Sequence, residues 1–251
     1  MAAFDNCVAL VTGGSSGIGL ASARALLAQG ARRVYITGRD GDRLAGAAHA
    51  LGERAVAIAA DVAQPAQLER LRAAIVARGD RLDVLFANAG VAHNNLLGET
   101  GEAEFDTIFD TNVRGVFFTV QTMLPLLKDG ASIVLNASVA GSKGMANLSV
   151  YSASKAAVRA FARAWATDLK PRGIRVNTVS PGVTETPILA RGLGMDATAI
   201  AGVQGYLAMA APAGRMAQPD EIANAVLFLA SAAASYVNGV ELSVDGGLAQ
   251  V

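Results

Sequence analysis

Short runs of hydrophobic residues alternate along the chain with segments whose apolar residues recur at helical spacing. The runs are rich in Val, Ile and Leu, as is typical of buried parallel strands. They cover residues 7–11, 33–37, 55–59, 83–87, 132–136, 175–179 and 240–244. Helical patterns lie between most of them, at 20–29, from Pro65, at 102–128, at 151–169 and from Pro219. The alternation predicts one Rossmann-like α/β domain over residues 1–251, with a doubly wound, seven-stranded parallel sheet and helices on both faces.

One long segment between the sixth and seventh predicted strands has no strand pattern. Residues 184–215 are rich in Ala, Gly, Met and Leu. A connection of this length within a compact domain is usually functional. We therefore predict a substrate lid at about residues 184–215.

The composition excludes several classes of partner. The 251 residues are 52% hydrophobic, and 21 Lys and Arg residues balance 21 Asp and Glu residues. Because the chain has no basic run with interleaved aromatic residues, no nucleic-acid partner is expected. Polar residues interrupt the longest apolar stretches, 116–127 and 225–237, so neither predicts a membrane span.

Cysteine and histidine residues do not form a recognisable disulfide or metal pattern. Cys7 is the single cysteine, and it opens an apolar run, so a core position is expected for it. His49 and His93 lack the spacing of metal ligands, and no metal site is predicted. The first eight residues lack a basic region followed by a hydrophobic segment, so a cytoplasmic location is expected.

The first predicted strand leads into a glycine-rich turn and then into a helix. Residues 12–19 read Thr-Gly-Gly-Ser-Ser-Gly-Ile-Gly. Glycines permit positive φ and let backbone N–H groups approach a phosphate, and the following helix points its positive end at the same anion. The spacing lacks the Lys-Ser/Thr pair of a nucleoside-triphosphate loop, so a triphosphate ligand is disfavoured. The turn favours a dinucleotide, although a purely structural connection uses the same residue types.

The residues after the second predicted strand bear on the choice of cofactor. In dinucleotide folds, an acidic residue here binds the ribose 2′-hydroxyl, whereas an arginine accommodates a 2′-phosphate. This chain has Gly38 followed by Arg39, which favours NADP(H). Asp40 is the next residue, so NAD(H) stays possible.

A tyrosine and a lysine at helical spacing are the strongest candidates for acid–base chemistry. Tyr151 and Lys155 are four residues apart and share a helix face. A nearby positive charge favours the phenolate of a tyrosine, whose ordinary pKa is about 10. Ser138 follows the fifth predicted strand, where parallel sheets place their ligands. Asn112 interrupts a helical pattern, which suggests either exposure or a water held near a site.

Taken together, these motifs resemble those of the single-domain short-chain dehydrogenases/reductases. The resemblance rests on residues 12–19, Asp61, Asn88-Ala89-Gly90, Asn112, Ser138, Tyr151-x-x-x-Lys155, Ser180-Pro181-Gly182 and residues 244–247. It covers nearly the whole chain, and the order and spacing are more specific than any single motif. Within the family, the pattern is most similar to 3-oxoacyl-carrier-protein reductases, sugar dehydrogenases and broad ketone reductases.

The resemblance implies a role for each catalytic candidate. Tyr151 is expected to be the general acid that protonates a carbonyl oxygen as hydride arrives from the nicotinamide, and the base in the reverse direction. Lys155 is expected to lower the pKa of Tyr151 and to hold the nicotinamide ribose. Ser138 is expected to orient the substrate oxygen, and Asn112 to anchor a water that links Lys155 to solvent.

The same resemblance implies a set of cofactor contacts. The pyrophosphate, adenine, adenosine and nicotinamide contacts are expected from Gly13, Ser15, Ser16, Gly17, Ile18, Gly19, Arg39, Asp61, Val62, Asn88, Ala89, Gly90, Tyr151, Lys155, Pro181, Gly182, Thr184 and Thr186. Two of these have plausible structural alternatives. Asn88 can simply form a turn, and Thr186 can cap a helix that begins at Pro187.

The segments expected to select the substrate, 141–150 and 184–215, are mainly apolar. Their large apolar residues are Met145, Leu148, Leu189, Leu193, Met195, Tyr206 and Met209, and their cations include Lys143 and Arg191. We therefore predict an NADPH-dependent oxidoreductase for a neutral ketone or secondary alcohol. The alternatives are a 3-oxoacyl thioester reductase, an NAD-linked sugar or alcohol dehydrogenase and, from a different class, a nucleotide sensor without turnover.

Self-association is also expected. Ala160, Ala164 and Trp165 form part of an apolar helix face that can pair with a second copy, together with the final helix. The resemblance implies a homotetramer.

Overall fold

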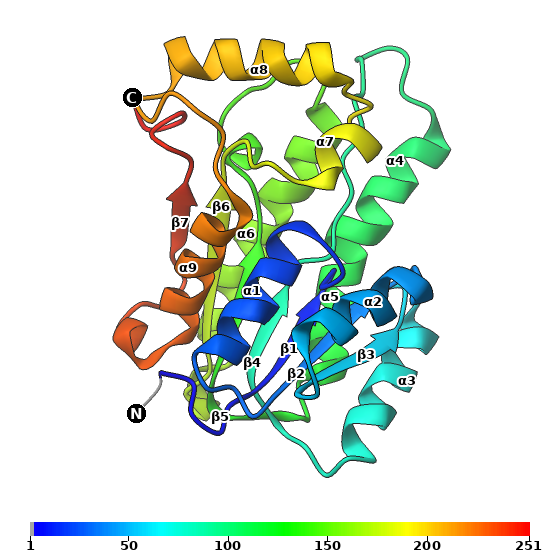
Figure 1. The fold of residues 1–251 in the computed structure, drawn as a ribbon, viewed down its shortest axis with the longest axis vertical. Helices are drawn as coiled ribbons and strands as arrows, with labels where there is room; N and C mark the ends of the chain where they lie inside the picture. Colours follow the sequence, from blue (N-terminus) through cyan, green and yellow to red (C-terminus); the bar gives the residue numbers. More distant parts are fainter. Residues whose placement is uncertain (1–2) are drawn as a thin grey trace.

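The computed structural model describes residues 3–251 (Figure 1). In this part of the chain, one parallel sheet has the strand order β3-β2-β1-β4-β5-β6-β7. The strands are β1 (Val8–Thr12), β2 (Arg33–Gly38), β3 (Ala55–Ala59), β4 (Leu82–Ala87), β5 (Leu127–Asn136), β6 (Arg175–Pro181) and β7 (Glu241–Val244). The order reverses between β1 and β4, which is the switch point where such sheets bind ligands. The predicted doubly wound, Rossmann-like fold is confirmed.

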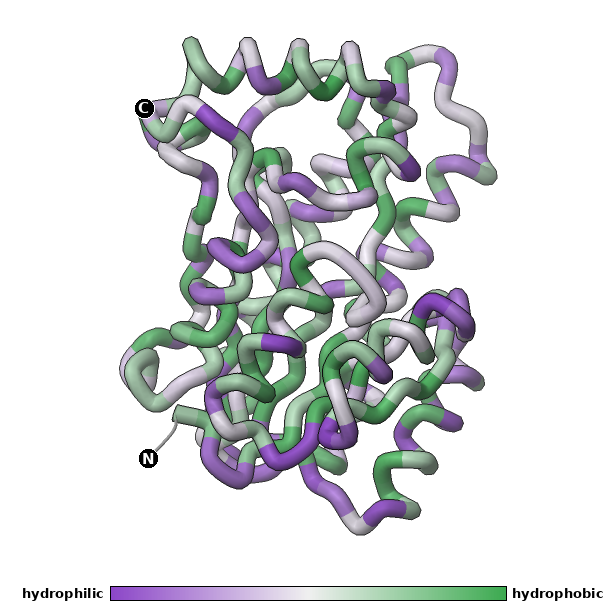
Figure 2. Tube along the Cα trace, viewed as in Figure 1, coloured by the Kyte–Doolittle hydropathy of each residue, from purple (hydrophilic) through white to green (hydrophobic). Residues whose placement is uncertain are grey.

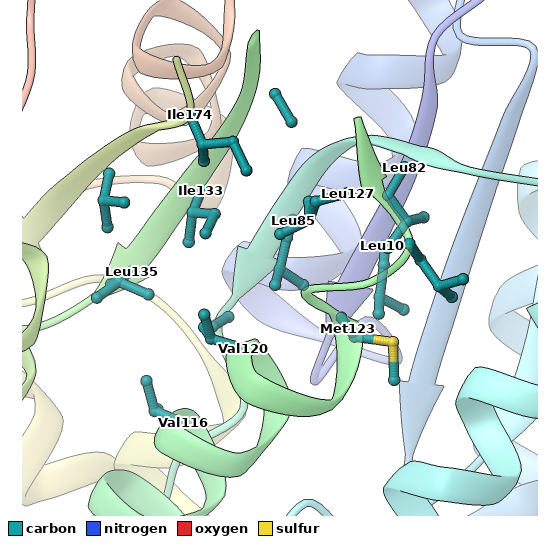
Figure 3. Packing of buried hydrophobic residues seen from close by; sticks show 14 of the residues in the cluster. Leu10, Leu82, Leu85, Val116, Val120, Met123, Leu127, Ile133, Leu135 and Ile174 are labelled. Carbon is teal, nitrogen blue, oxygen red and sulfur yellow. The ribbon is translucent and has the colours of Figure 1, made fainter. Parts of the chain in front are cut away.

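Helices cover both faces of the sheet. One face packs against α1 (Gly17–Ala28), α2 (Gly41–Leu51) and α9 (Pro219–Ala230). The other packs against α3 (Pro65–Val76), α5 (Gly115–Met123) and α6 (Ser149–Asp168). Figure 3 shows the second of these cores, where Val116, Val120 and Met123 of α5 point at the strands. The inner strands β2, β1, β4, β5 and β6 are therefore buried on both sides, which explains their hydrophobic sequences, whereas the edge strands β3 and β7 are only partly buried.

The predicted helix over 102–128 is wrong in two respects. It is interrupted by a π-helical turn, Asp110–Arg114, between α4 (Glu102–Phe109) and α5. It also ends at Met123, and β5 begins at Leu127 rather than at residue 132. The early part of β5 contains the exposed residues 129 and 130 and a register shift against β4, and these features hid the strand from the hydrophobic pattern.

The predicted lid segment contains two helices. They are α7 (Pro187–Arg191) and α8 (Ala197–Ala210), and both lie at the top of Figure 1, beyond the end of β7. Helix α8 is hydrophobic along most of its length (Figure 2), yet Leu207 is its one buried residue. Leu189 and Leu207 join Met216 and Leu248 in a small core separate from the two cores of the sheet. The lid thus packs in a small core that it shares with Met216 and Leu248, which follow it in the sequence.

The remaining helical turns are short. They are Val139–Gly141 (η2), Lys170–Arg172 (η3) and Ala232–Ala234 (η4). The turn η2 follows directly after Ser138 and leads toward α6. Across the described part of the chain, every helix is too short or too polar to cross a bilayer.

Charged residues at the amino ends of the strands are paired. The Asp80 side chain is 2% exposed and accepts hydrogen bonds from Arg32 at 2.7 Å and Tyr35 at 2.6 Å, and it also pairs with Arg33. Burial raises the pKa of Asp80, but these hydrogen bonds outweigh burial and hold the pKa below its usual value. The buried carboxylate is therefore compensated by its partners.

Cys7 lies in the core just before β1, as expected. It is 7% exposed and packs in the core formed with α1, α2 and α9. Burial, reinforced by the negative charge of Asp83, raises the pKa of the Cys7 thiol to about 12. The thiol is therefore protonated and unreactive in the folded protein.

Candidate active site

A cavity of about 500 Å³ lies at the carboxyl ends of the central strands. Its walls come from segments far apart in the sequence. They include the turn after β1, the residues after β2, β4, β5 and β6, the start of α6, and α7. The position is the switch point of the sheet, where a dinucleotide is expected.

Almost all predicted site residues line this cavity. Those that do are Gly13, Ser15, Ser16, Gly17, Ile18, Arg39, Asp61, Val62, Asn88, Ala89, Gly90, Ser138, Tyr151, Lys155, Pro181, Gly182, Thr184 and Thr186. Gly19 and Asn112 do not line it. Residues predicted from seven different segments are thus brought together by the fold.

Gly19 has a packing role. A Cβ at this position would lie 2.3 Å from the Gly13 carbonyl oxygen and 2.6 Å from Asn88 Nδ2. No side chain fits there without moving the turn. Gly19 therefore allows α1 to begin against the glycine turn, and it shapes the cavity without facing it.

The start of α1 fits a phosphate. The Ser16 side chain makes no capping hydrogen bond, and the first turn of the helix has no acidic residue. The backbone N–H groups at this end therefore lack a side-chain partner from the protein, and the helix dipole makes the end attractive to anions. Together with the cavity wall formed by Ser15, Ser16 and Gly17, this is suited to a pyrophosphate.

A hydrogen-bond chain connects the glycine turn with Lys155. Asn88 Nδ2 donates to the Thr12 carbonyl oxygen at 2.9 Å, and Asn136 Nδ2 donates to Asn88 Oδ1 at 2.9 Å. Lys155 Nζ in turn donates to the Asn136 carbonyl oxygen at 2.8 Å. Asn88 is thus a brace between β1 and β5 as well as a cavity residue. Asn136 was not predicted, because its role depends on strand neighbours distant in sequence.

Ser138 and Tyr151 both line the cavity, and their side chains interact. Burial raises the pKa of Tyr151, and a side-chain hydrogen bond with Ser138 opposes this rise. The net direction is opposite to the predicted lowering by Lys155. The Lys155 Nζ lies 5.7 Å from the centre of the Tyr151 ring and donates to Asn136, so its charge does not dominate at the phenol. Tyr151 is therefore held in its protonated form at neutral pH.

Within residues 3–251, Lys155 is buried and forms no ion pair. It is 4% exposed, and burial lowers its pKa to about 8. A carbonyl oxygen stabilises the ammonium less than a carboxylate does. The lysine can therefore lose its proton near neutral pH, which is the property needed in a proton path.

Asn112 sits in the π-helical turn and is fully buried. Its Oδ1 accepts from the Val91 N–H at 2.8 Å, and its Nδ2 donates to the Val91 carbonyl oxygen at 2.8 Å and to Ser154 Oγ at 3.0 Å. The side chain therefore joins the cavity loop at Val91 to helix α6. Its role as the anchor of a water stays a prediction.

The two segments predicted to select the substrate, 141–150 and 184–215, contribute fewer residues than expected. Met145, Leu148, Leu189 and Leu193 line the cavity, as does Arg191. The other four predicted residues do not line it: Lys143 donates to the Leu248 carbonyl oxygen, and Met195, Tyr206 and Met209 of the lid lie elsewhere. Tyr206 is 48% exposed and Met209 is 86% exposed, so α8 turns these side chains to solvent.

Several cavity residues were missed by the sequence interpretation. His93 lines the cavity in the loop after β4, and Arg43 lines it from α2. Arg43 forms an ion pair with Asp40 at 2.9 Å, and the Asp40 side chain also accepts from the Arg43 N–H at 3.0 Å. An aspartate before a helix start is a recognisable N-cap signal, so this role of Asp40 could have been found from sequence.

Comparison with known proteins identifies the family. Residues 13–249 match a family model described as "Enoyl-(Acyl carrier protein) reductase". The crystal structure of levodione reductase is similar, with a TM-score of 0.91 and 32% identity over 98% of both chains. The chain belongs to the short-chain dehydrogenase/reductase family.

Curated members of the family cover the whole length of this chain. A cis-4-hydroxycyclohexanecarboxylate dehydrogenase from Sinomonas cyclohexanicum is 40% identical, with 99% of each chain covered. A cyclopentanol dehydrogenase from Comamonas testosteroni is 38% identical, with 98% of each chain covered. The chain is accordingly an oxidoreductase that acts on alcohol or ketone groups and uses a nicotinamide dinucleotide.

Proposed function

We propose that this short-chain dehydrogenase/reductase is an NADPH-dependent carbonyl reductase in which Tyr151 is the general acid. The proposal is carried by one observation: Ser138, Tyr151 and the buried Lys155 line the same cavity, and Ser138 interacts with Tyr151. The bound nicotinamide supplies the hydride in this reaction. The residues of the chain supply the proton and the geometry.

Tyr151 Oη donates its proton to the substrate oxygen. The raised pKa of Tyr151 keeps the hydroxyl protonated near neutral pH, which suits reduction of a ketone. Ser138 Oγ donates a hydrogen bond to the same oxygen and fixes the carbonyl in a reactive orientation. In the reverse direction, the tyrosinate accepts the proton of an alcohol.

Lys155 returns the proton to Tyr151. Its pKa of about 8 lets it exchange protons near neutral pH. We propose that a water near Asn112 resupplies Lys155, and that the lysine also holds the nicotinamide ribose. Burial favours the neutral forms of both catalytic groups, whereas the positive charge of an oxidised nicotinamide would favour the tyrosinate needed for alcohol oxidation.

Replacement of Tyr151 tests the proposal. Tyr151→Phe keeps the ring and removes the proton donor, so kcat on a good ketone should fall by about 10²-fold to 10⁴-fold. Nucleotide binding, followed by NADPH fluorescence, should change little because the ring remains in place. Normal turnover by this variant would show that the assigned mechanism is wrong.

We propose NADP(H) as the preferred cofactor because of the charges after β2. Arg39 lines the cavity and forms no ion pair within residues 3–251. Asp40, the competing residue, is engaged by the guanidinium and the backbone N–H of Arg43. A free cation and a neutralised carboxylate both favour a 2′-phosphate.

Two variants test whether Arg39 or Asp40 determines the choice between NADPH and NADH. Arg39→Ala should lower kcat/KM with NADPH by about 10-fold to 100-fold, the loss expected for a charge-assisted hydrogen bond, and leave kcat/KM with NADH nearly unchanged. Asp40→Ala should not reduce turnover with NADH. Equal kcat/KM of the native protein with both cofactors would remove the proposed role of Arg39.

The substrate is proposed to be a ketone or secondary alcohol with an apolar body. Met145, Leu148, Leu189 and Leu193 give the cavity an apolar wall next to the catalytic residues. The printed names of two relatives, which include cyclopentanol and a hydroxycyclohexanecarboxylate, point to cyclic secondary alcohols. A panel of cyclic and linear ketones and alcohols, assayed with both cofactors, tests this assignment.

A 3-oxoacyl thioester is the second candidate substrate, because the description of the matching family model refers to an acyl carrier protein. The same panel should include a short 3-oxoacyl thioester. A kcat/KM for the thioester above that for every simple ketone would favour this alternative. Tight NADPH binding without any turnover would favour a nucleotide sensor.

We also propose that the chain acts as one domain with a lid at 184–215, and that it assembles as a homotetramer. Trp165 stacks on Phe161 with ring centres 4.8 Å apart, and Ala160 and Ala164 beside them are exposed. Phe228 of α9 is 43% exposed. Burial of these faces between copies stabilises an assembly. Light scattering that gives a monomer mass at micromolar concentration would exclude it.

A further inference from the structure

The turn that carries Ser138 makes backbone contact with the helix that carries Tyr151 and Lys155. A Cβ placed on Gly141, the last residue of η2, would lie 3.1 Å from both the Ala156 nitrogen and the Lys155 carbonyl carbon. This approach is closer than most side chains allow. The separation of Ser138 from the catalytic helix therefore depends on how η2 is held against α6.

Arg159 holds η2 on this helix. Its Nη1 donates to the Gly141 carbonyl oxygen at 3.0 Å. It lies one turn beyond Lys155 and two turns beyond Tyr151, so the three residues share one face of α6. The Arg159 side chain is 25% exposed and forms an ion pair with Glu241 of β7.

Glu241 extends the connection to two further segments. Its Oε1 accepts from Ser180 Oγ at 2.7 Å and from Ser142 Oγ at 3.3 Å. Ser180 belongs to β6, and Ser142 follows η2 directly. The Glu241 side chain is 15% exposed, so water screens the pair weakly. The turn is thus tied to α6, β6 and β7 by one arginine and one glutamate.

The side chains of η2 are packed, since Val139 is 3% and Ala140 is 4% exposed. On the side of the charged pair, however, an open hollow of about 480 Å³ is lined by Val139, by Ser142, and by Arg159 and Glu241 themselves. On that side few side chains oppose a movement of the turn. The charged pair therefore adds a restraint to the packing of Val139 and Ala140.

We propose that Arg159 and Glu241 are positioning residues that keep Ser138 at hydrogen-bonding distance from Tyr151 and the substrate oxygen. The inference rests on the proposed function of Ser138 and Tyr151. Neither residue of the pair lines the cavity that contains Ser138 and Tyr151. A displacement of about 1 Å at a reacting group can cost about 10²-fold in rate, so the pair has a large effect on turnover without contacting the substrate.

Arg159→Met is the first test, because it keeps the length of the side chain and removes both polar contacts. We expect kcat for a ketone to fall by about 10-fold to 100-fold, with KM for the nucleotide changed by less than about 2-fold. Glu241→Gln keeps an oxygen for Ser180 and Ser142 but removes the charge, and should lower kcat by a smaller factor. Arg159→Lys, which can keep one contact, should recover part of the kcat lost in Arg159→Met.

A double-mutant cycle shows whether the effect passes through Ser138. In a Ser138→Ala background, Arg159→Met should lower kcat by less than about 2-fold, since the group that it positions is already absent. Multiplicative effects of the two substitutions would overturn the proposal. A merely structural role predicts such independence.

Arg172 provides a matched control at the opposite end of the sheet. It donates to the Leu124 carbonyl oxygen at 3.0 Å and pairs with Asp129 at 2.9 Å, and its side chain is 30% exposed. Arg172→Met should lower the melting temperature and leave kcat unchanged. If Arg159→Met does not fold, Glu241→Gln and Arg159→Lys carry the test, and an unchanged kcat in both would overturn the proposal.

The outcome also separates this inference from the proposed function. Normal turnover by Tyr151→Phe would refute the proposed function itself. An inactive Tyr151→Phe variant, combined with an Arg159→Met variant that behaves like Arg172→Met, would refute only the positioning role. Both sets of variants are assayed on the same ketone and with the same nucleotide.

Discussion

At the two ends of the same sheet, buried charged residues have opposite surroundings. At the amino end, Asp80 is buried among Arg32, Arg33 and Tyr35, and its pKa lies below the usual value. At the carboxyl end, Lys155 is equally buried but faces a carbonyl oxygen, and burial alone lowers its pKa to about 8. Asp80 is therefore held in its ionised form, whereas the charged and neutral forms of Lys155 are close in free energy near neutral pH.

This difference separates stability from function. A paired buried charge is held in its ionised form, and removal of a partner is costly to folding. An unpaired one can change its protonation state near neutral pH, which makes it useful in proton transfer and costly to the fold. Replacement of Lys155 should therefore change mainly turnover, whereas replacement of Asp80 should change mainly stability.

The largest effect is expected at the carboxyl end. Lys155→Met removes the buried amine and keeps most of the side-chain volume, so kcat/KM should fall by about 10²-fold to 10⁴-fold. Thermal stability at neutral pH should not decrease, because an uncompensated buried charge has been removed. Turnover and melting temperature are measured on the same sample.

Lys128→Met is the matched control at the amino end. Lys128 pairs with Asp83 at 2.8 Å. Its replacement should lower stability and leave kcat unchanged, the reverse of the pattern at Lys155. A Lys155→Met variant with full activity would contradict the functional side of the comparison.

Asp80→Ala should have the next largest effect, on stability. The substitution leaves the buried Tyr35 hydroxyl and two partly exposed arginines without their shared acceptor, so the free energy of unfolding should fall by about 1–3 kcal/mol. Urea denaturation measures the loss, and kcat per folded molecule should stay the same. A loss below about 1 kcal/mol would show that the amino-end cluster is not a stabilising unit.

The pH dependence of stability should reveal Lys155 in the absence of nucleotide. Its pKa is about 8 in the folded protein, against an ordinary value of 10.5. Between these pH values the unfolded chain binds more protons, so this residue makes the free energy of unfolding rise with pH, by about 3 kcal/mol in total. Below pH 8 the destabilisation is fully present.

The contribution of Lys155 is obtained as a difference between proteins. Cys7 has the opposite sign, because its thiol ionises near 9 when unfolded and near 12 when folded. Comparing the native protein with Lys155→Met removes this shared contribution. Parallel stability curves for the two proteins between pH 8 and 10 would disprove the unpaired burial of Lys155.

The smallest effect is expected at Asn136, which links the glycine turn with Lys155. Asn136→Ala removes the side-chain hydrogen bond to Asn88 and keeps the backbone carbonyl that accepts from Lys155. Loss of one such hydrogen bond, worth about 1 kcal/mol, should raise KM for the nucleotide about 5-fold and change kcat less. A fall in kcat with an unchanged nucleotide KM would place the effect at Lys155 instead.

The sequence was sufficient where a residue's role is local. The period of the apolar runs predicted all seven strands in the described chain, and the glycine turn was predicted by its position after β1. Helix α2 was not predicted, because Leu44 and Ala47 are its only buried residues and small residues dominate the rest. In α8, which is apolar but largely exposed, composition suggested a substrate wall that the structure does not form.

The features that could not be predicted depend on distant residues. Asn136 donates a hydrogen bond to Asn88, and Arg159 forms an ion pair with Glu241 of β7. Burial raises the pKa of Tyr151, the opposite of the predicted direction, because helical spacing shows neither the burial of the phenol nor that the Lys155 ammonium donates to Asn136. Pairings of this kind follow from strand order, which local patterns do not encode.

The buried Cys7 thiol can report how often the folded protein opens. The thiol lies directly before β1 and is 7% exposed, so an alkylating reagent can reach it only when this part of the chain opens. Because the chain has no other cysteine, each labelled molecule records one such opening. At a low concentration of reagent, the rate of alkylation gives the free energy of that opening. A nucleotide bound to the folded protein should lower this rate as its occupancy rises.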